Sequence, residues 1–193
     1  MFWTQIHQLD QELTLWINSI HNPAIDPVMQ FFSSIPAWIP MYAAVLGCLF
    51  WRLTWKKALV VTISLILTVL LCDQLSNLIK DIVQRLRPCH DNFMVSSGMW
   101  MLEGKGGLYG FFSGHSANSF GFAVCSSMGF SNDTRLRYRG YKAWIFFWAA
   151  MVSISRIFVG KHYLGDVIVG ICVGIMVGYL MGKIAKYAIT KLK

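Results

Sequence analysis

The sequence predicts an all-α integral membrane protein: a bundle of about five transmembrane helices with an N-terminal helix at the membrane interface. Three observations predict this fold class. The 193 residues are 55% hydrophobic and 13% charged, roughly half the charge of an average soluble domain. The apolar residues are gathered in runs long enough to cross a bilayer. The basic residues lie between these runs, so membrane topology explains the net charge of +8 better than nucleic-acid binding does.

Residues 1–36 are expected to form an interfacial or re-entrant segment. A helix over residues 1–20 has one apolar face and one polar face, which is typical of a helix lying on a membrane surface. A short helix packed on the bundle has the same pattern, so both interpretations stay open. Asp10 and Glu12, without a basic region before them, argue against a cleavable signal peptide. Residues 25–35 are apolar but too few to span, which predicts a partly inserted or re-entrant helix.

A transmembrane core is predicted for residues 37–187, and the whole chain, 1–193, is expected to be one membrane domain. Five runs in the core could cross a bilayer. They cover residues 37–53, 57–79, 113–130, 142–159 and 163–187. The last run has glycine at every fourth position from 170 to 182, which allows close helix approach. The long connection at 81–112 is rich in glycine and is expected to be an irregular, functional, extracytoplasmic loop.

Positive charge predicts the orientation of the chain. Alternating spans place three basic clusters on one side, which should be the cytoplasm of a bacterium, together with the C-terminus. The clusters are Arg52, Lys56 and Lys57; Arg135, Arg137, Arg139 and Lys142; and Lys183, Lys186, Lys191 and Lys193. The N-terminal helix and loop 81–112 then face the outside of the cytoplasmic (inner) membrane.

The cysteines show no metal-type spacing. Four of them lie in apolar runs and are expected to be small core residues: Cys48, Cys72, Cys125 and Cys172. The sequence predicts no metal site, no cofactor and no nucleic-acid partner, and it leaves the oligomeric state open.

Two polar segments on the predicted outer face can bind an anion. Lys80 and Arg87 are seven residues apart, two helical turns, so both can face one spot. Ser113 and Gly114 open a span with a hydroxyl and free N–H groups, which together form an anion site, and His115 could donate a proton there. Each segment alone has an ordinary explanation. Lys80 and Arg87 can be helix-end side chains that extend to water, and the second segment can be a capped helix start with an interfacial histidine.

A third polar segment follows the fourth run. His162 and Asp166 are four residues apart, so on a helix they share a face. A carboxylate bound to one ring nitrogen fixes the tautomer and leaves the other nitrogen free as a base or nucleophile. Arg156 adds a planar cation suited to phosphate or carboxylate. The plain alternative is a polar helix end at the membrane surface.

Taken together, the three segments predict a phosphate site. Three cations that converge on one point need an anion of more than one charge, which fits phosphate better than carboxylate. Two separate histidines indicate one nucleophile and one acid, although the residues alone do not say which one attacks.

The three segments resemble the signature of the type 2 phosphatidic acid phosphatase superfamily in order and spacing. The matching stretches are Lys80-x6-Arg87-Pro88, Ser113-Gly114-His115 and Ser155-Arg156-x5-His162-x3-Asp166. The resemblance covers about residues 37–187. Phe112 stands where the family often has proline, a residue that contributes rigidity rather than chemistry, so activity is expected to survive. Residues 1–36 and the interior of 89–112 carry no family motif, and that loop is expected to select the substrate.

The resemblance implies a metal-independent hydrolase of a lipid phosphomonoester or diphosphate. His162 is similar to the nucleophile that forms a phosphohistidine, Asp166 would orient it, and His115 would protonate the leaving oxygen and then activate water. The residues implied to bind the phosphate are Lys80, Arg87, Ser113, Gly114 and Arg156. The substrates implied are membrane lipids: a phosphate of lipid A, undecaprenyl diphosphate or phosphatidylglycerol phosphate.

The main alternative is an anion or lipid transporter, for which intramembrane cations and a glycine-rich helix would also serve. A transporter needs access from both faces and often has repeated halves. The sequence has no internal repeat, and its polar groups cluster on one predicted face. A purely structural scaffold would leave the coincidence of three motifs unexplained.

Overall fold

The computed structural model describes residues 2–192. Every secondary-structure element assigned in that range is a helix, which confirms the all-α prediction. The α-helices are α1 Phe2–Asn18, α2 Ile25–Ser33, α3 Ile39–Arg52, α4 Trp55–Val83, α5 Asn92–Ser96, α6 Gly114–Phe130, α7 Arg139–Phe158 and α8 Leu164–Lys191. The 3₁₀ helices are η1 Ile35–Trp38 and η2 Pro88–His90.

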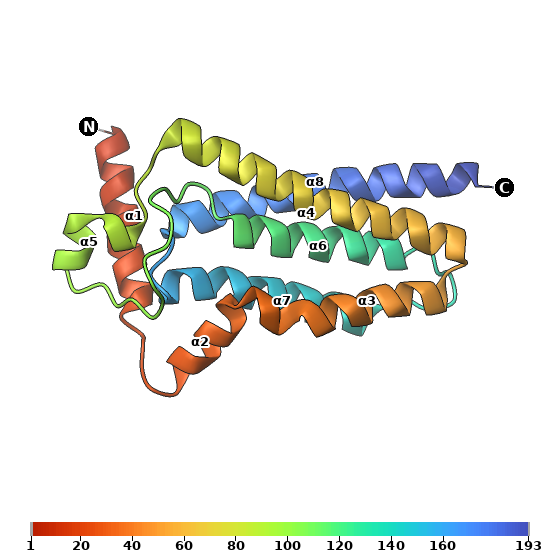
Figure 1. The fold of residues 1–193 in the computed structure, drawn as a ribbon, viewed down its shortest axis with the longest axis horizontal. Coiled ribbons are helices and arrows are strands. Elements are labelled where there is room, and N and C mark those ends of the chain that lie inside the picture. The colour runs from red at the N-terminus through yellow and green to blue at the C-terminus, as the bar shows by residue number, and fades with distance from the viewer. Residues whose placement is uncertain (1, 193) are drawn as a thin grey trace.

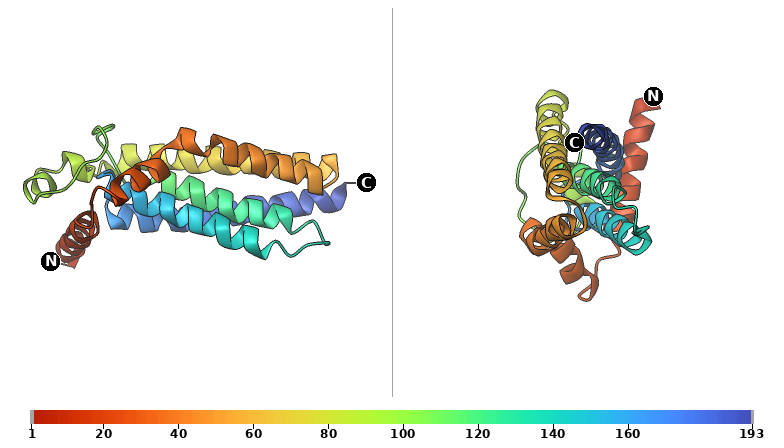
Figure 2. Two further views of the ribbon diagram at one scale, coloured as in Figure 1. Left: turned by 90° about the horizontal axis from the view of Figure 1, so that it is seen from below. Right: turned by 90° about the vertical axis from the view of Figure 1, so that its right-hand side faces the viewer.

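Five long helices, α3, α4, α6, α7 and α8, run along the molecule as a bundle, and α6 packs against α4, α7 and α8 (Figure 1, Figure 2). The short helix α1 lies across one end of this bundle, and the C-terminus lies at the other. The α3–α4 and α6–α7 connections lie at the same end as the C-terminus. The three basic clusters therefore gather there, apart from Lys193, which lies outside the described residues.

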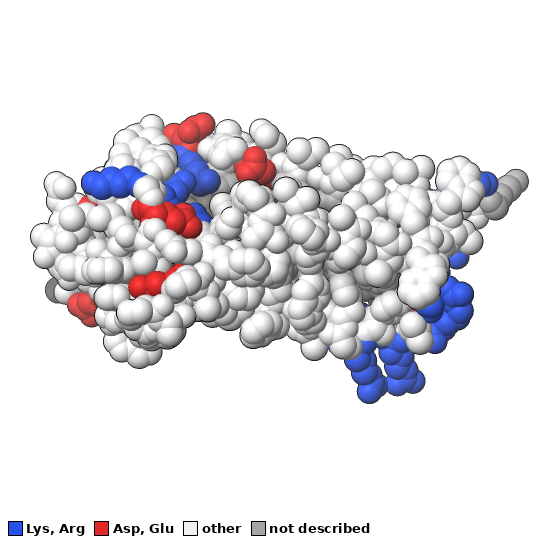
Figure 3. Space-filling model, turned by 60° about the horizontal axis from the view of Figure 1, so that its bottom comes forward, with Lys and Arg blue, Asp and Glu red and all other residues white. Residues whose placement is uncertain are grey.

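Charged side chains lie at both ends of the face shown in Figure 3, with a wide band almost free of them between the ends. Within residues 2–192, three helical stretches are long and apolar enough to cross a membrane: Ile35–Arg52, Trp55–Val83 and Leu164–Thr190. The total of five spans stays a prediction, because α6 and α7 are not among these three. Helix α6 is rich in Gly, Ser and Ala because it is enclosed by its neighbours, so its sequence is less apolar than that of a helix facing lipid.

Helices α6 and α8 are in close contact through glycine. A methyl group at Gly174 would overlap the carbonyl group of Ala117, and one at Gly178 would overlap that of Gly121. This contact confirms the close approach predicted from the glycine spacing. It also brings the start of α6 against the first turns of α8, where the Ser113 N–H donates to the Asp166 carbonyl oxygen at 3.0 Å.

Several predicted boundaries and positions need correction. Helix α4 reaches Val83 rather than residue 79, and it ends where Gln84 takes the left-handed conformation (φ 51°). The connection after it is mainly irregular, as predicted, but it contains η2, α5 and a cis peptide bond between Phe111 and Phe112. Cys48 and Cys172 are exposed rather than buried, because they lie on outward faces of their helices.

The polar face of α1 packs on the bundle, and its apolar face points outward. Thr14 and Asn18 are buried, and the Asn18 Nδ2 donates to the Ile157 and Phe158 carbonyl oxygens at 3.1 Å each. The large apolar side chains of the other face are exposed: Trp3, Ile6, Leu9, Leu13 and Trp16. The packing of this helix on the bundle is therefore confirmed, and its place on a membrane surface stays a prediction, which the exposed apolar face favours. Insertion of residues 25–35 into a membrane stays a prediction.

Candidate active site

A cavity of about 610 Å³ lies between α2, α3, α4, α6 and α7. Six of the eight predicted site residues line it: Lys80, Arg87, Gly114, His115, Arg156 and His162. They come from the helix ends and loops nearest α1, so segments far apart in the sequence meet at one end of the bundle. The predicted convergence of cations and histidines is therefore present in the structure.

Two of the cations come from α4 and the loop that follows it. Lys80 lies in the last turn of α4, and its Nζ would be 3.9 Å from a methyl group placed on Gly114. Arg87 follows the left-handed turn at Gln84, so the two residues do not share one helix face as predicted. They still reach the same cavity, because the Arg87 Nε donates to the Tyr109 carbonyl oxygen at 3.0 Å, which fixes its direction.

Arg156 is the most enclosed of the cavity cations, with 6% of its side chain exposed. Its Nη1 hydrogen-bonds the Ser33 hydroxyl of α2, and that hydroxyl donates to Glu103 Oε1 at 2.5 Å. The other Glu103 oxygen lies 3.8 Å from Arg156 Nη1. Ser33 and Glu103 lie in the two parts of the chain that carry no family motif, residues 1–36 and the interior of 89–112, and they hold in place an arginine that is predicted to bind phosphate.

Ser113 has a different contact from the one expected. It is the N-cap of α6, and its Oγ accepts hydrogen bonds from the Ser116 N–H at 3.4 Å and the Ser116 hydroxyl at 3.0 Å. Its side chain is fully buried and is not part of the cavity lining. A phosphate-binding role for Ser113 stays a prediction.

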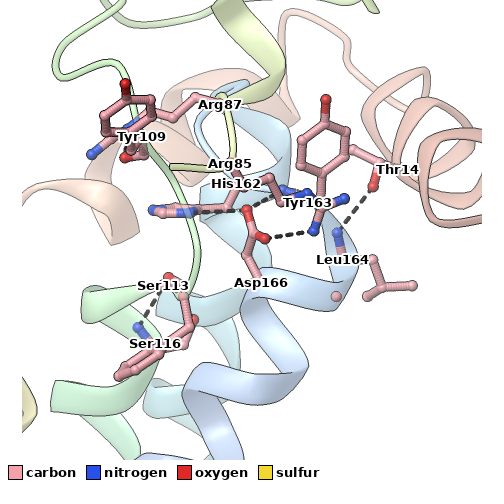
Figure 4. A network of polar contacts seen from close by, with 12 residues as sticks. Thr14, Arg85, Arg87, Tyr109, Ser113, Ser116, His162, Tyr163, Leu164 and Asp166 are labelled. Carbon is pink, nitrogen blue, oxygen red and sulfur yellow. Dashed lines mark hydrogen bonds and ion pairs between the residues drawn. The ribbon is translucent and has the colours of Figure 1, made fainter. Parts of the chain in front are cut away.

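His162 and Asp166 meet across a helix start rather than along one helix face (Figure 4). Helix α8 begins only at Leu164, and Asp166 lies in its first turn, where its Oδ2 accepts from the Tyr163 N–H at 3.1 Å. His162 Nδ1 lies 3.5 Å from the same oxygen, and both side chains are buried. The distance is longer than a good hydrogen bond, as is common for catalytic pairs without substrate.

The surroundings of His162 keep its ring neutral. Burial lowers the pKa of His162 well below its usual value, and the positive charges of Arg156, Arg87 and Lys80 lower it further. A neutral imidazole retains a lone pair, which a nucleophile or general base requires.

Arg85 is a site residue that the sequence did not single out. Its Nη1 donates to Asp166 Oδ1 at 2.7 Å and its Nη2 to Asp10 Oδ2 at 2.6 Å. Burial alone would lower the pKa of Arg85, but the two carboxylates outweigh burial and raise it. The only signal in the sequence was its place among cations on the side of the membrane where topology disfavours them.

Within the described residues, no three His, Cys, Asp or Glu side chains form a group able to hold a metal ion. The titratable groups that line the cavity are the cations Lys80, Arg87 and Arg156, two histidines and one carboxylate, Asp73. Positive charge is therefore in excess there, which suits an anionic ligand.

A family model described as the PAP2 superfamily matches residues 57–189. The chain belongs to the PAP2 superfamily. This membership confirms the resemblance inferred from the three motifs. The match also includes all eight predicted site residues, which lie between positions 80 and 166.

Two curated PAP2 relatives cover most of this chain. A lipid A 4′-phosphatase of Bacteroides thetaiotaomicron is 34% identical over 190 residues, which are 97% of this chain and 82% of the relative. A lipid A 4′-phosphatase of Porphyromonas gingivalis is 34% identical over 184 residues, covering 95% of this chain and 75% of the relative.

Solved structures of PAP2-type proteins share the fold. The transmembrane phosphatidylglycerolphosphate phosphatase of Bacillus subtilis superposes with a TM-score of 0.74 at 18% identity, covering 98% of this chain and 90% of that one. Aquifex aeolicus LpxE superposes with a TM-score of 0.64 at 23% identity, covering 89% and 93%. At these identities the likeness establishes the membrane helical fold.

Proposed function

We propose that this PAP2 protein is a phosphatase that hydrolyses the phosphate group of a membrane lipid. The observation that carries this proposal is the composition of one cavity. Its lining contains three cations, two histidines and a single carboxylate, Asp73, and much of the remaining wall is apolar, including Phe32, Trp38, Tyr42, Leu65, Phe122 and Trp148. A phosphate joined to an apolar chain matches both parts of such a cavity.

In the first step of the proposed reaction, His162 Nε2 attacks phosphorus and the bond from phosphorus to the lipid oxygen breaks. His115 gives its proton to that oxygen, and the phosphoryl group stays on His162 as a phosphohistidine. Asp166 stabilises the positive ring through Nδ1, for which the 3.5 Å separation must shorten slightly.

In the second step, His115 takes a proton from water, the water oxygen attacks phosphorus, and inorganic phosphate leaves with the bond to His162 broken. Lys80, Arg87 and Arg156 offset the negative charge in both steps. Because these fixed cations perform the task that a metal ion performs in other phosphatases, we propose that hydrolysis is independent of metal and needs no cofactor.

The site is proposed to face the outside of a bacterial cytoplasmic membrane, with residues 1–193 as a single domain. The basic clusters at the opposite end of the bundle support this orientation. Among the candidate substrates, the names of the two relatives favour a phosphate of lipid A over undecaprenyl diphosphate or phosphatidylglycerol phosphate.

Phosphate release by the purified protein tests the proposal. The protein is incubated in detergent with each of the three lipid phosphates, with excess chelator present. We expect release from at least one lipid, fastest from lipid A. No release from any lipid, with or without chelator, would contradict the lipid phosphatase. Release that depends strictly on an added divalent ion would contradict the metal-independent reaction alone.

A further inference from the structure

Helix α1 is joined to Asp166 by two ion pairs that share Arg85, and Figure 4 shows the one between Arg85 and Asp166. The Arg85 guanidinium bridges two carboxylates: Nη1 lies 2.7 Å from Asp166 Oδ1, and Nη2 lies 2.6 Å from Asp10 Oδ2. The same guanidinium stacks 3.9 Å above the ring of Tyr163. A planar fork held by two carboxylates and one ring has little freedom to turn, so the position of each carboxylate depends on the other.

Helix α1 also caps the start of α8. The Gly165 N–H donates to Asp10 Oδ1 at 2.7 Å, and the Leu164 N–H donates to Thr14 Oγ1 at 2.9 Å. These are first-turn N–H groups, which have no partner within their own helix. A methyl group at Gly165 would lie 2.8 Å from Asp10 Oδ2, so glycine there lets α1 come close. Helix α1 thus fixes the turn that carries Asp166.

Asp166 depends on these contacts for its direction. It is fully buried, and besides Arg85 its side chain contacts the Tyr163 N–H and His162. A buried carboxylate that loses a charged partner turns toward any remaining donor or takes up a proton. Either change would alter its alignment with His162 Nδ1.

We propose that Asp10 and Arg85 are positioning residues for the phosphatase reaction, holding Asp166 in the orientation that polarises His162. The inference rests on the proposed function. Neither residue lines the cavity that contains Lys80, Arg87 and Arg156. They therefore act through Asp166 and not on the phosphate, which makes the N-terminal helix part of the catalytic apparatus.

The test compares kcat and KM of full-length variants on the lipid phosphate that the wild type hydrolyses. Arg85→Gln should lower kcat about 10²-fold, because a small misplacement of a reacting group costs that much, while KM stays within about twofold. Asp10→Asn keeps an oxygen for the Gly165 N–H but loses the charge, and it should lower kcat roughly 10-fold. In the Arg85→Gln background, Asp10→Asn should have no further effect, since the coupling runs through Arg85.

Matched controls separate positioning from general damage. Glu12→Gln removes an exposed acid of the same helix that contacts Gln8, and it should leave kcat unchanged. Guanidinium ion should restore part of kcat to Arg85→Ala, because it can occupy the space of the lost group. Arg137→Ala, at the far end of the bundle, should have wild-type kcat, and added guanidinium ion should not raise it.

Each remaining outcome tests a specific claim. Unchanged kcat in Asp10→Asn and in a folded Arg85→Gln would overturn the positioning role. A raised KM with normal kcat would show that Arg85 binds substrate instead. If Arg85→Gln does not fold, a normal kcat in Asp10→Asn overturns the proposal and a selective loss supports it. A wild-type protein that releases no phosphate from any lipid would contradict the proposed function itself.

Discussion

At the residue scale, the two histidines are expected to differ in their dependence on the leaving group. An alkoxide needs a proton to leave, whereas a nitrophenolate needs it far less. His115→Ala should therefore lose about 10²–10⁴-fold in kcat with a lipid monoester and markedly less with an activated aryl phosphate. His162→Ala should be inactive with both substrates. Equal losses for His115→Ala on the two substrates would contradict its role as general acid.

The buried, neutral state of His162 predicts a pH dependence of stability. The folded-state pKa of His162 lies below the unfolded value of about 6.5, so only the unfolded chain takes up this proton as the pH falls below that value. Above about pH 6.5 this histidine is neutral in both states and does not change the free energy of unfolding with pH. Below that value the fold loses stability, because the proton binds preferentially to the unfolded chain. Thermal unfolding in detergent at pH 7.5 and 5.5 should show a smaller acid-induced drop in Tm for His162→Asn than for wild type. An equal drop would contradict a depressed pKa.

The sequence predicted the chemistry of the site better than its supporting contacts. Lys80, Arg87 and Arg156 could be placed together because span direction and charge decide which helix ends meet. The supporting residues could not, because Arg85 pairs with Asp10 across 75 positions and with Asp166 across 81. Side-chain contacts at such separations depend on the angle at which α1 crosses the bundle, and no local pattern encodes that angle.

At the scale of elements, the α6–α8 contact controls the distance between the start of α6 and Asp166. Gly174→Ala should force the two helices apart, at a cost of about 1–3 kcal/mol in stability, and should lower activity by moving Gly114 and His115 away from His162. Gly47→Ala, on α3, meets nothing within 4 Å and should stabilise by about 0.5–1 kcal/mol without loss of activity. Thermal unfolding and phosphate release measure both variants. Full activity in Gly174→Ala would contradict this role.

The sequence predicted helices well where long hydrophobic runs determine them. The prediction was incomplete where tertiary packing determines which face of a helix is buried. Continuous apolar runs predicted α4 and α8 well, apart from their ends. For α1, amphipathicity alone could not show which face packs on the protein. The structure answers this by burying Thr14 and Asn18 and exposing Leu9 and Trp16, because the polar side chains satisfy free backbone groups at the ends of α7 and α8.

At the scale of the whole molecule, the proposed orientation can be tested by cysteine labelling of intact cells in a cysteine-free background. Gly104→Cys, in the loop beside the site, should react with a membrane-impermeant reagent added from outside. Arg137→Cys, at the opposite end, should react only after the membrane is permeabilised. The orientation is wrong if Arg137→Cys labels from outside and Gly104→Cys is protected.

The central claim is that phosphate passes through a covalent bond to His162, and trapping that bond tests it most directly. Purified wild type, His115→Ala and His162→Ala are mixed with an activated phosphate ester labelled on phosphorus, in excess chelator, and then quenched with base. We predict labelled histidine in the wild type and in His115→Ala, and none in His162→Ala. Label that survives in His162→Ala and vanishes in His115→Ala would contradict the account.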